Sequence, residues 1–137
     1  ATMVEAEGKT FSFEAPDALT PEVLETFPYE YPGREALVEI STDEWTCVCP
    51  FSGLPDFGTL TVRYLPSDGC IELKSFKYYL TSFRNVGIYQ EHAANRVLED
   101  LVGCCAPRWS ARRPAARAWG RFSKRWVRCP ARRSTSR

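Results

Sequence analysis

The chain has 137 residues, is 44% hydrophobic and carries a formal net charge of +1. This length predicts a single domain with a modest core, and no stretch approaches the roughly 20 apolar residues of a membrane span, so a membrane protein is not expected. Glu5, Glu7 and Lys9 interrupt residues 1–13, which therefore lack the apolar run of a signal peptide, and we expect a cytoplasmic protein.

The first clear strands are predicted in the middle of the chain. Residues 35–41 and 59–65 have the composition of strands, and in the second segment apolar residues alternate with polar ones. Pro55 and Asp56 lie between these segments and are expected in a loop.

Two helical segments follow a turn at 66–69 and a short strand near 70–73. In the first, three apolar residues recur at helical spacing: Phe76, Leu80 and Phe83. The second runs from 89 to 102 and places four apolar residues on one face: Ala94, Val97, Leu98 and Leu101. The order of strand, strand, helix and helix predicts an α+β fold.

Three blocks between Trp45 and Arg96 have the order and separation of the motifs of a known enzyme family. They are CPFSGLPDF at 49–57, ELKSFKYY at 72–79, and SFRN at 82–85 followed by Gln90 and Glu91. In these blocks the chain resembles the unimodular 7-cyano-7-deazaguanine reductases, the QueF-type family of the tunnelling-fold superfamily. The family patterns are C-P-x-[ST]-G-x-P-D-[FW] and E-[SL]-K-S-x-K-x-[YF].

This resemblance implies a tunnelling fold, in which an antiparallel sheet carries two helices on one face. It implies a cyclic homo-oligomer with sites between subunits, and no direct contact with nucleic acid or membrane. The implied reaction is reduction of the nitrile of 7-cyano-7-deazaguanine to 7-aminomethyl-7-deazaguanine by two NADPH in succession, in the biosynthesis of the modified tRNA nucleoside queuosine. The chain contains no G-x-G-x-x-G, so a nicotinamide site would not be of the Rossmann kind.

By family position, Cys49 is the nucleophile and Asp56 the proton donor. A nitrile carbon is a weak electrophile, and a covalent step through a thiolate divides the barrier by forming a thioimide while Asp56 protonates the nitrogen. Taken alone, Cys49 also fits a small buried hydrophobic residue, and Asp56 an ordinary turn carboxylate. The complete motif favours the catalytic interpretation of both.

The resemblance also implies contacts with substrate at five residues: Ile71, Glu72, Leu73, Gln90 and Glu91. An ionised carboxylate accepts hydrogen bonds from the N–H groups of a purine-like ligand, a role that suits Glu72 and Glu91, although Glu91 alone also fits a solvated helix residue. Lys74 and Lys77 share a helix face and are expected to meet cofactor phosphates, with a solvated face as the alternative. No metal is expected.

Six cysteines leave structural alternatives open. A disulfide framework is disfavoured because no secretion signal is seen. A zinc site is disfavoured because neither Cys47 with Cys49 nor Cys104 with Cys105 has C-x-x-C spacing, and His92 is the only histidine. The single histidine also argues against the alternative enzyme, a zinc-dependent GTP cyclohydrolase-like protein of the same superfold.

Charge divides the chain into a catalytic domain at 1–107 and a tail at 108–137. The first part holds 7 basic and all 17 acidic residues, whereas the tail holds 11 basic residues, no acid, and neither Leu nor Ile. The resemblance ends near Pro107 and Arg108, and the family's N-P-R-G-G-like turn is missing. We therefore expect C-terminal strands that are lost or altered, and a tail that is disordered or poorly packed.

Two interpretations of the tail are open. One is a basic arm that binds nucleic-acid phosphates, with tryptophans for stacking, which would make the chain a nucleic-acid-binding protein. The other is that these residues are not the evolved C-terminus, for example after a shift of reading frame. The second is favoured because the tail shows no nucleic-acid fold signature.

Overall fold

Two long strands form the hairpin around which the molecule is built. The computed structural model describes residues 12–105, 118–122 and 125–128. β2 (Val38–Val48) pairs antiparallel with β3 (Pro55–Tyr64). β3 then pairs with β5 (Ala118–Phe122), and β5 pairs with β6 (Arg125–Arg128), which gives a four-stranded antiparallel sheet in the order β2-β3-β5-β6.

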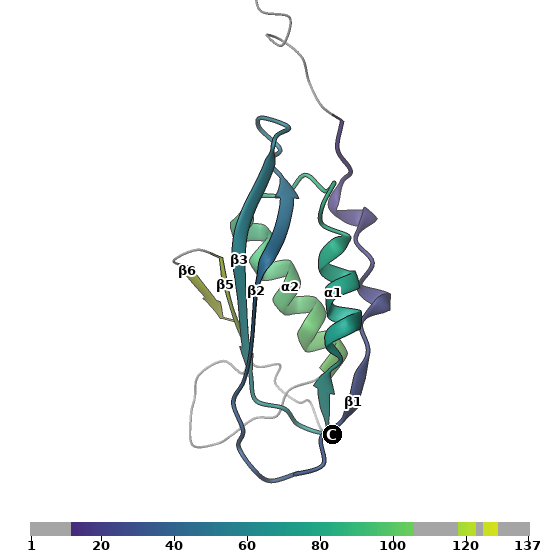
Figure 1. Cartoon of the computed structure of the whole chain (residues 1–137), viewed down its shortest axis with the longest axis vertical. Coiled ribbons are helices and arrows are strands. Elements are labelled where there is room, and N and C mark those ends of the chain that lie inside the picture. The colour runs from purple at the N-terminus through teal and green to yellow at the C-terminus, as the bar shows by residue number, and fades with distance from the viewer. Residues whose placement is uncertain (1–11, 106–117, 123–124, 129–137) are drawn as a thin grey trace, which may run out of the picture.

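Both α-helices of the described chain lie on one face of this sheet (Figure 1). α1 (Leu73–Thr81) lies beside β2, and α2 (Gln90–Cys105) packs across β5 and β6. The predicted α+β order, with two helices on one face, is confirmed. None of the helices in the described ranges has the length and apolar character needed to cross a bilayer.

A second, two-stranded sheet joins the N-terminal segment to the start of α1. β1 (Thr26–Pro28) pairs with β4 (Gly69–Ile71), with Phe27 opposite Cys70. Two short 3-10 helices, η1 (Pro16–Ala18) and η2 (Pro21–Val23), precede β1, and η2 contacts α1. The sequence did not predict β1, η1 or η2, because they contain prolines and have no periodic apolar pattern.

The core lies between the hairpin and the helices. The rings of Trp45 on β2 and Phe83 after α1 are 4.5 Å apart, and Phe83 meets the ring of Tyr79 edge-on at 5.3 Å. From the sheet, Leu60, Val62 and Tyr64 are at most 2% exposed. The apolar faces predicted for the two helices are buried. They consist of these residues: Phe76, Leu80, Ala94, Val97, Leu98 and Leu101.

A β-bulge divides the hairpin into two registers. Thr42 lies opposite Leu60, but the next pair is Trp45 opposite Gly58, so two residues of β2, Asp43 and Glu44, face a single residue of β3. Side chains alternate between the two faces of a strand. The extra residue therefore changes which positions of β2 face the core: even-numbered residues before the bulge and odd-numbered residues after it. Trp45 and Cys47 therefore point into the core, where both are 0% exposed.

The expected strand boundaries need correction at the end of the hairpin that carries the motif. The first strand was predicted at 35–41 but runs from Val38 to Val48. Pro55 and Asp56 were predicted in a loop and instead begin β3. The connection is a short turn at 49–54, so pairing resumes at once, and a proline is tolerated there because it is the first residue of the strand.

The tail contributes strands where no packed element was expected. β5 and β6 fall within 108–137, and β5 pairs with β3 from Leu60 opposite Phe122 to Tyr64 opposite Ala118. Strands pair through backbone groups, which need neither Leu nor Ile. The rest of the tail lies outside the described residues, and the division of the chain at 107 stays a prediction.

Candidate active site

Cys49 is held in the tight turn that joins β2 to β3. The Cys49 N–H donates to the carbonyl of Leu54 at 2.8 Å, and the Gly53 N–H donates to the carbonyl of Cys49 at 2.8 Å. Gly53 has φ of 69°, a left-handed conformation that favours glycine. The turn leaves Cys49 partly exposed, at the end of the hairpin.

Groups of the same turn favour the thiolate form of Cys49. The Ser52 hydroxyl, the Ser52 N–H and the Phe51 N–H lower the pKa of Cys49 below its ordinary value, while slight burial and the negative charge of Asp56 act in the opposite direction. A thiolate is the reactive form of cysteine, so this environment suits a nucleophile.

Cys47, two residues earlier, has the opposite character. Its side chain is 0% exposed, and its thiol donates to the carbonyl of Ile88 at 3.5 Å. Burial, and then the charge of Asp56, raise the pKa of Cys47 to about 11, with the Trp45 indole N–H partly offsetting them. The two cysteines of the C-x-C pair therefore differ: Cys47 is a core thiol with a raised pKa, whereas Cys49 is a partly exposed thiol with a lowered pKa.

Asp56 is the second residue of β3, directly after the turn that holds Cys49. Its Cα partner on β2 is Cys47, and its charge acts on the sulfurs of both Cys47 and Cys49. The side chain is half-buried. The predicted nucleophile and the predicted proton donor are thus brought to the same end of one hairpin.

The start of α2 is held against this end of β2. The Val48 N–H donates to the Val86 carbonyl at 2.9 Å, and the Ile88 N–H donates to the Val48 carbonyl at 3.1 Å. α2 begins two residues after Ile88, so Gln90 and Glu91 lie in its first turn, close to Cys49 along this pairing. Gln90 is half-buried and Glu91 is exposed.

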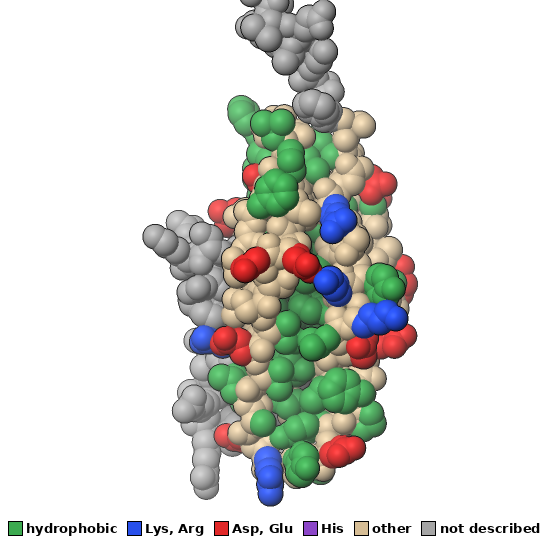
Figure 2. Space-filling model, in the orientation of Figure 1, with side chains coloured by type: hydrophobic (Ala, Val, Ile, Leu, Met, Phe, Trp, Pro, Cys, Tyr) green, Lys and Arg blue, Asp and Glu red, His purple; other side chains and the backbone are tan. Residues whose placement is uncertain are grey.

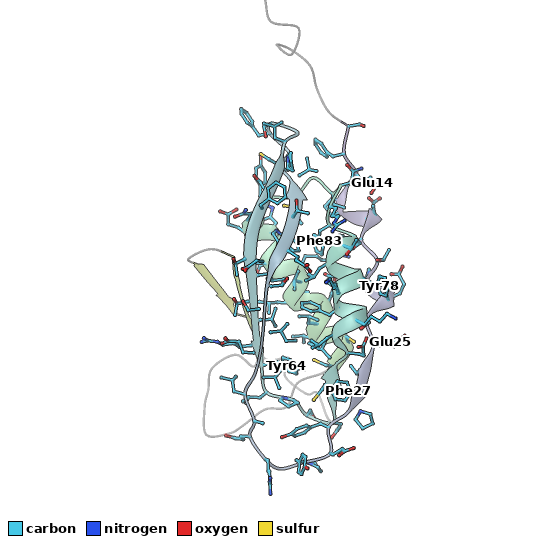
Figure 3. The ribbon with its side chains drawn as sticks, in the orientation of Figure 1. Glu14, Glu25, Phe27, Tyr64, Tyr78 and Phe83 are labelled. Carbon is cyan, nitrogen blue, oxygen red and sulfur yellow. The ribbon has the colours of Figure 1, made fainter. Side chains whose placement is uncertain are left out.

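The remaining predicted substrate residues lie at the opposite end of the molecule. The Ile71 N–H donates to the Tyr64 hydroxyl at 3.0 Å, and Tyr64 ends β3 whereas Asp56 is near its start. Eight residues of strand span about 25 Å. Figure 1 shows β4 and the start of α1 far from the β2–β3 connection, and Figure 3 places Tyr64 and Phe27 at that same far end. Within one chain, the substrate residues predicted at 71–73 therefore do not come near Cys49 and Asp56.

Glu72 forms the N-terminal cap of α1. Its carboxylate accepts from the backbone N–H of Lys74 at 2.9 Å and of Ser75 at 2.7 Å, and these two donors lower its pKa. Glu72 is therefore an ionised acceptor, and its oxygens keep lone pairs for a further partner. Its neighbour Ile71 is 2% exposed, whereas Leu73 is 58% exposed.

Lys77 lies on the rim of a groove between β2 and α1. The groove has a volume of about 230 Å³ and a floor that includes Ile40, Phe76 and Leu80, and Figure 2 shows hydrophobic side chains gathered along this face. The Lys77 ammonium pairs with Glu44 of the bulge at 2.9 Å. Lys74 is exposed on the same helix, with its Nζ 6.0 Å from the centre of the Tyr78 ring.

Sequence reasoning missed two functional features of this region. Ser52 was seen only as a motif position. Its hydroxyl accepts a hydrogen bond from the backbone N–H of Leu54, which is typical of a serine in a turn. Glu44 gave no signal, because its approach to Lys77 follows from the bulge. Among the described residues, no group of three His, Cys, Asp or Glu side chains is placed to hold a metal ion.

The comparison that decides the family is a match to the QueF-like protein family over residues 55–125, just over half of the chain. The chain belongs to this family. The family inferred from the three motif blocks is therefore confirmed. The match also continues past residue 108, where the motif resemblance was expected to end, and reaches the first residue of β6.

Similar proteins include several named NADPH-dependent 7-cyano-7-deazaguanine reductase. Proteins named NADPH-dependent 7-cyano-7-deazaguanine reductase are 52% identical over 101 residues in Caldicellulosiruptor bescii, covering 74% of this chain and 77% of that protein. The corresponding protein of Thermoanaerobacter pseudethanolicus is 54% identical over 100 residues, covering 73% of each chain. The crystal structure of the archaeosine synthase QueF-Like in the apo form matches with a TM-score of 0.55 at 25% identity, over 65% of this chain and 80% of that one. The predicted tunnelling fold is confirmed.

Proposed function

We propose that this chain catalyses the NADPH-dependent reduction of 7-cyano-7-deazaguanine to 7-aminomethyl-7-deazaguanine, a step in queuosine biosynthesis. The observation that carries the proposal is the hairpin end, where a tight turn leaves Cys49 partly exposed and close to Asp56, the cross-strand partner of Cys47. This arrangement occurs in a chain about half identical to proteins named for that reaction. The proposed location is the cytoplasm, in keeping with five free cysteines among the described residues.

In the proposed first step, the Cys49 thiolate adds to the nitrile carbon, and Asp56 gives its proton to the nitrile nitrogen. The product is a thioimide, and the net change is addition of S–H across the carbon–nitrogen triple bond, with no leaving group. Glu91, beside Cys49, and Glu72 are acceptors for the N–H groups of the bicyclic ligand. Glu91 would come from the subunit that supplies Cys49 and Glu72 from a second copy of the chain, because the two residues lie at opposite ends of the molecule within one chain.

The cofactor is assigned to the exposed face of α1. Bound NADPH supplies hydride, one for each of the two reductions that convert a nitrile to a primary amine. Lys74 and Lys77 are both exposed and lie three residues apart on the helix, which fits cations that contact phosphates. The backbone N–H groups of Lys74 and Ser75 are already bound by Glu72, so the side chains rather than the helix start would hold the phosphates.

We also propose that each site is completed by a second copy of the chain in a cyclic homo-oligomer. The separation of about 25 Å between the Cys49 and Glu72 ends of the hairpin supports this, because no bicyclic ligand spans it. β2 has eleven residues and no strand partner on its outer side among the described residues. The apolar groove runs along that free edge, as expected for a surface covered by another subunit.

The covalent step is tested by intact-mass spectrometry of the full chain incubated with 7-cyano-7-deazaguanine and no NADPH. The expected product has the mass of the protein plus the whole ligand, maps to the peptide that contains Cys49, and is absent from Cys49→Ala. A product that has lost water or ammonia, or no product from folded protein at saturating ligand, would overturn the proposed reaction.

The shared site is tested by mixing two variants. Cys49→Ala and Glu72→Gln would each damage a different half of the site, and random mixing restores both native residues at roughly a quarter of the interfaces. The mixed oligomers should be more active than the average of the two variants. An activity equal to that average, in mixtures shown by two affinity tags to contain both chains, would mean that the halves do not meet across subunits.

A further inference from the structure

Ser75 is a buried serine in the first turn of α1. The residue is only 6% exposed, so its hydroxyl has to find hydrogen-bond partners within the protein. The hydroxyl donates to the backbone carbonyl of Glu72 at 2.8 Å and accepts from the backbone N–H of Glu25 at 2.9 Å. A hydroxyl has a single hydrogen to donate, and here that hydrogen is committed to Glu72.

These two bonds help to close a ring that joins the N-terminal segment to α1. The Glu72 N–H donates to the Glu25 carbonyl at 2.9 Å, which continues the antiparallel pairing of β1 and β4 by one residue. Glu25, which Figure 3 shows beside α1, is therefore linked to Glu72 twice, once directly and once through the Ser75 hydroxyl. The backbone of Glu72 is fixed from two sides.

The backbone of Ser75 also holds the carboxylate of Glu72. The Ser75 N–H donates to one carboxylate oxygen at 2.7 Å, and the Lys74 N–H donates to the other at 2.9 Å. Helix N-caps favour serine, threonine, aspartate and asparagine, whereas a longer glutamate loses more rotamer freedom there. A glutamate folded back onto two donors therefore has its direction set by the groups around it, and Ser75 supplies contacts to both its backbone and its side chain.

We propose that Ser75 is a positioning residue for ligand recognition, which holds the Glu72 carboxylate where it accepts from the N–H groups of 7-cyano-7-deazaguanine. This inference deepens the proposed function and rests on it. The Ser75 hydroxyl is buried and acts through Glu72, without touching the ligand itself. Loss of the hydroxyl should therefore weaken ligand binding and leave the chemistry at Cys49 unchanged.

The test follows thioimide formation in the full-length chain by intact-mass spectrometry, at increasing concentrations of 7-cyano-7-deazaguanine and without NADPH. Ser75→Ala should raise the half-saturating ligand concentration by about three- to tenfold and change the maximal rate by less than about twofold, because the lost hydrogen bonds act on binding. An unchanged half-saturating concentration in the folded variant would overturn the proposal.

Thr61 offers a matched control in the hairpin. It is also a buried residue with a hydroxyl, 8% exposed, and its oxygen lies 3.0 Å from the Ser41 hydroxyl on β2. Thr61→Val removes this hydrogen bond while keeping the shape of the side chain, so it should lower stability and leave the half-saturating concentration unchanged. Equal increases in Thr61→Val and Ser75→Ala would mean that lost stability alone explains the effect, contrary to the proposal.

A double variant separates positioning from a purely structural role. In Glu72→Ala no carboxylate is left to position, so adding Ser75→Ala should raise the half-saturating concentration no further. A further rise of about threefold or more in the double variant would show that Ser75 acts on binding by a route other than Glu72, and the positioning role would be wrong.

Hydrogen exchange tests the link between the two segments without any ligand. The Glu25 N–H should exchange faster in Ser75→Ala than in the wild type, while the amides of α2 stay protected and show that the fold is intact. Equal exchange at Glu25 in both proteins would contradict the link. If the wild type forms no thioimide at saturating ligand, the proposed function fails, whereas exchange at Glu25 still decides whether Ser75 joins α1 to the N-terminal segment.

Discussion

The hydroxyl of Tyr79 on α1 donates a hydrogen bond to the carboxylate of Asp100 on α2, with 2.5 Å between the two oxygens. The Arg96 Nε donates to the same carboxylate oxygen at 2.9 Å, so a single acid joins both helices. Tyr79 is 0% exposed, and its burial, followed by the Asp100 interaction, raises its pKa well above the ordinary range. This carboxylate therefore links α1 and α2, the two helices whose first turns hold the predicted substrate residues.

Removing either partner should destabilise the protein unequally. Tyr79→Phe removes a hydrogen bond and should lower the free energy of unfolding by about 1 kcal/mol. Asp100→Ala leaves the buried Tyr79 hydroxyl without its acceptor and should cost about 1–3 kcal/mol. Urea unfolding followed by circular dichroism measures both, and a smaller loss in Asp100→Ala than in Tyr79→Phe would contradict this account.

Alkaline pH should destabilise the fold through Tyr64. Burial raises the pKa of Tyr64 to about 12, compared with about 10 in an unfolded chain. Between these values the unfolded state loses the proton first, so the free energy of unfolding is at its full value below pH 10 and decreases as the pH rises toward 12. In Tyr64→Phe the decrease between pH 10 and 11 should be shallower. An identical slope in the variant would show that Tyr64 titrates normally in the folded state.

Two glycines should respond to alanine in opposite directions. A Cβ at Gly87 would lie 2.2 Å from two ring carbons of Phe13, so Gly87→Ala must displace that ring and should lower the free energy of unfolding by about 1–3 kcal/mol. A Cβ at Gly103, within α2, meets nothing within 4 Å, and Gly103→Ala should raise stability by about 0.5–1 kcal/mol. Thermal unfolding of the pair checks both signs. Adding Phe13→Ala to Gly87→Ala should recover part of the loss, and no recovery would locate the clash elsewhere.

The two cysteines of β2 and its turn should separate activity from stability. Cys49→Ala should abolish NADPH oxidation that depends on the nitrile and leave the fold intact, since the sulfur lies in an exposed turn. Cys47→Ala should keep most of the activity and lose about 1 kcal/mol of stability, because it leaves a small cavity in the core. Steady-state rates and urea midpoints distinguish these effects, and the reverse pattern would exchange the roles of the two residues.

Glu91 should contribute to ligand binding although it is exposed in the isolated chain. Glu91→Ala should weaken the affinity for 7-cyano-7-deazaguanine by roughly 1–3 kcal/mol, the cost of an unpaired donor on the bound ligand. Glu99→Ala alters another exposed glutamate of the same helix and should leave affinity unchanged. Isothermal titration calorimetry measures the affinity of both variants for the ligand. Wild-type affinity in Glu91→Ala would mean that Glu91 is a solvated residue that does not contact the ligand.

Periodicity was enough to predict the helices, because the buried positions from Ala94 to Leu101 follow the helical repeat. It was not enough for β2, because the bulge after Thr42 shifts the alternation and leaves Trp45 and Cys47 out of phase with Val38 and Ile40. The strands in the tail were missed for a related reason. A strand that pairs through its backbone needs no apolar pattern of its own.

The motif blocks predicted the residues of the candidate site without predicting their arrangement. Cys49 and Asp56 are seven positions apart and come together because a tight turn returns the chain on itself. Glu72 is only sixteen positions after Asp56, yet β3 carries the chain about 25 Å away before α1 begins. Separation in sequence therefore gave no guide to separation in space, and this distance is visible only once β3 is known to be straight and paired.

The bulge between Thr42 and Trp45 also limits how this gene can change length. A deletion of one codon at Asp43 would remove the extra residue and leave Trp45 two positions after Thr42, still opposite Gly58 and still facing the core. A deletion of both Asp43 and Glu44 would place Trp45 next to Thr42, turn it toward the opposite face of the sheet and lose the ion pair with Lys77. At this point of the hairpin the gene is therefore expected to tolerate the loss of a single codon and to reject the loss of two.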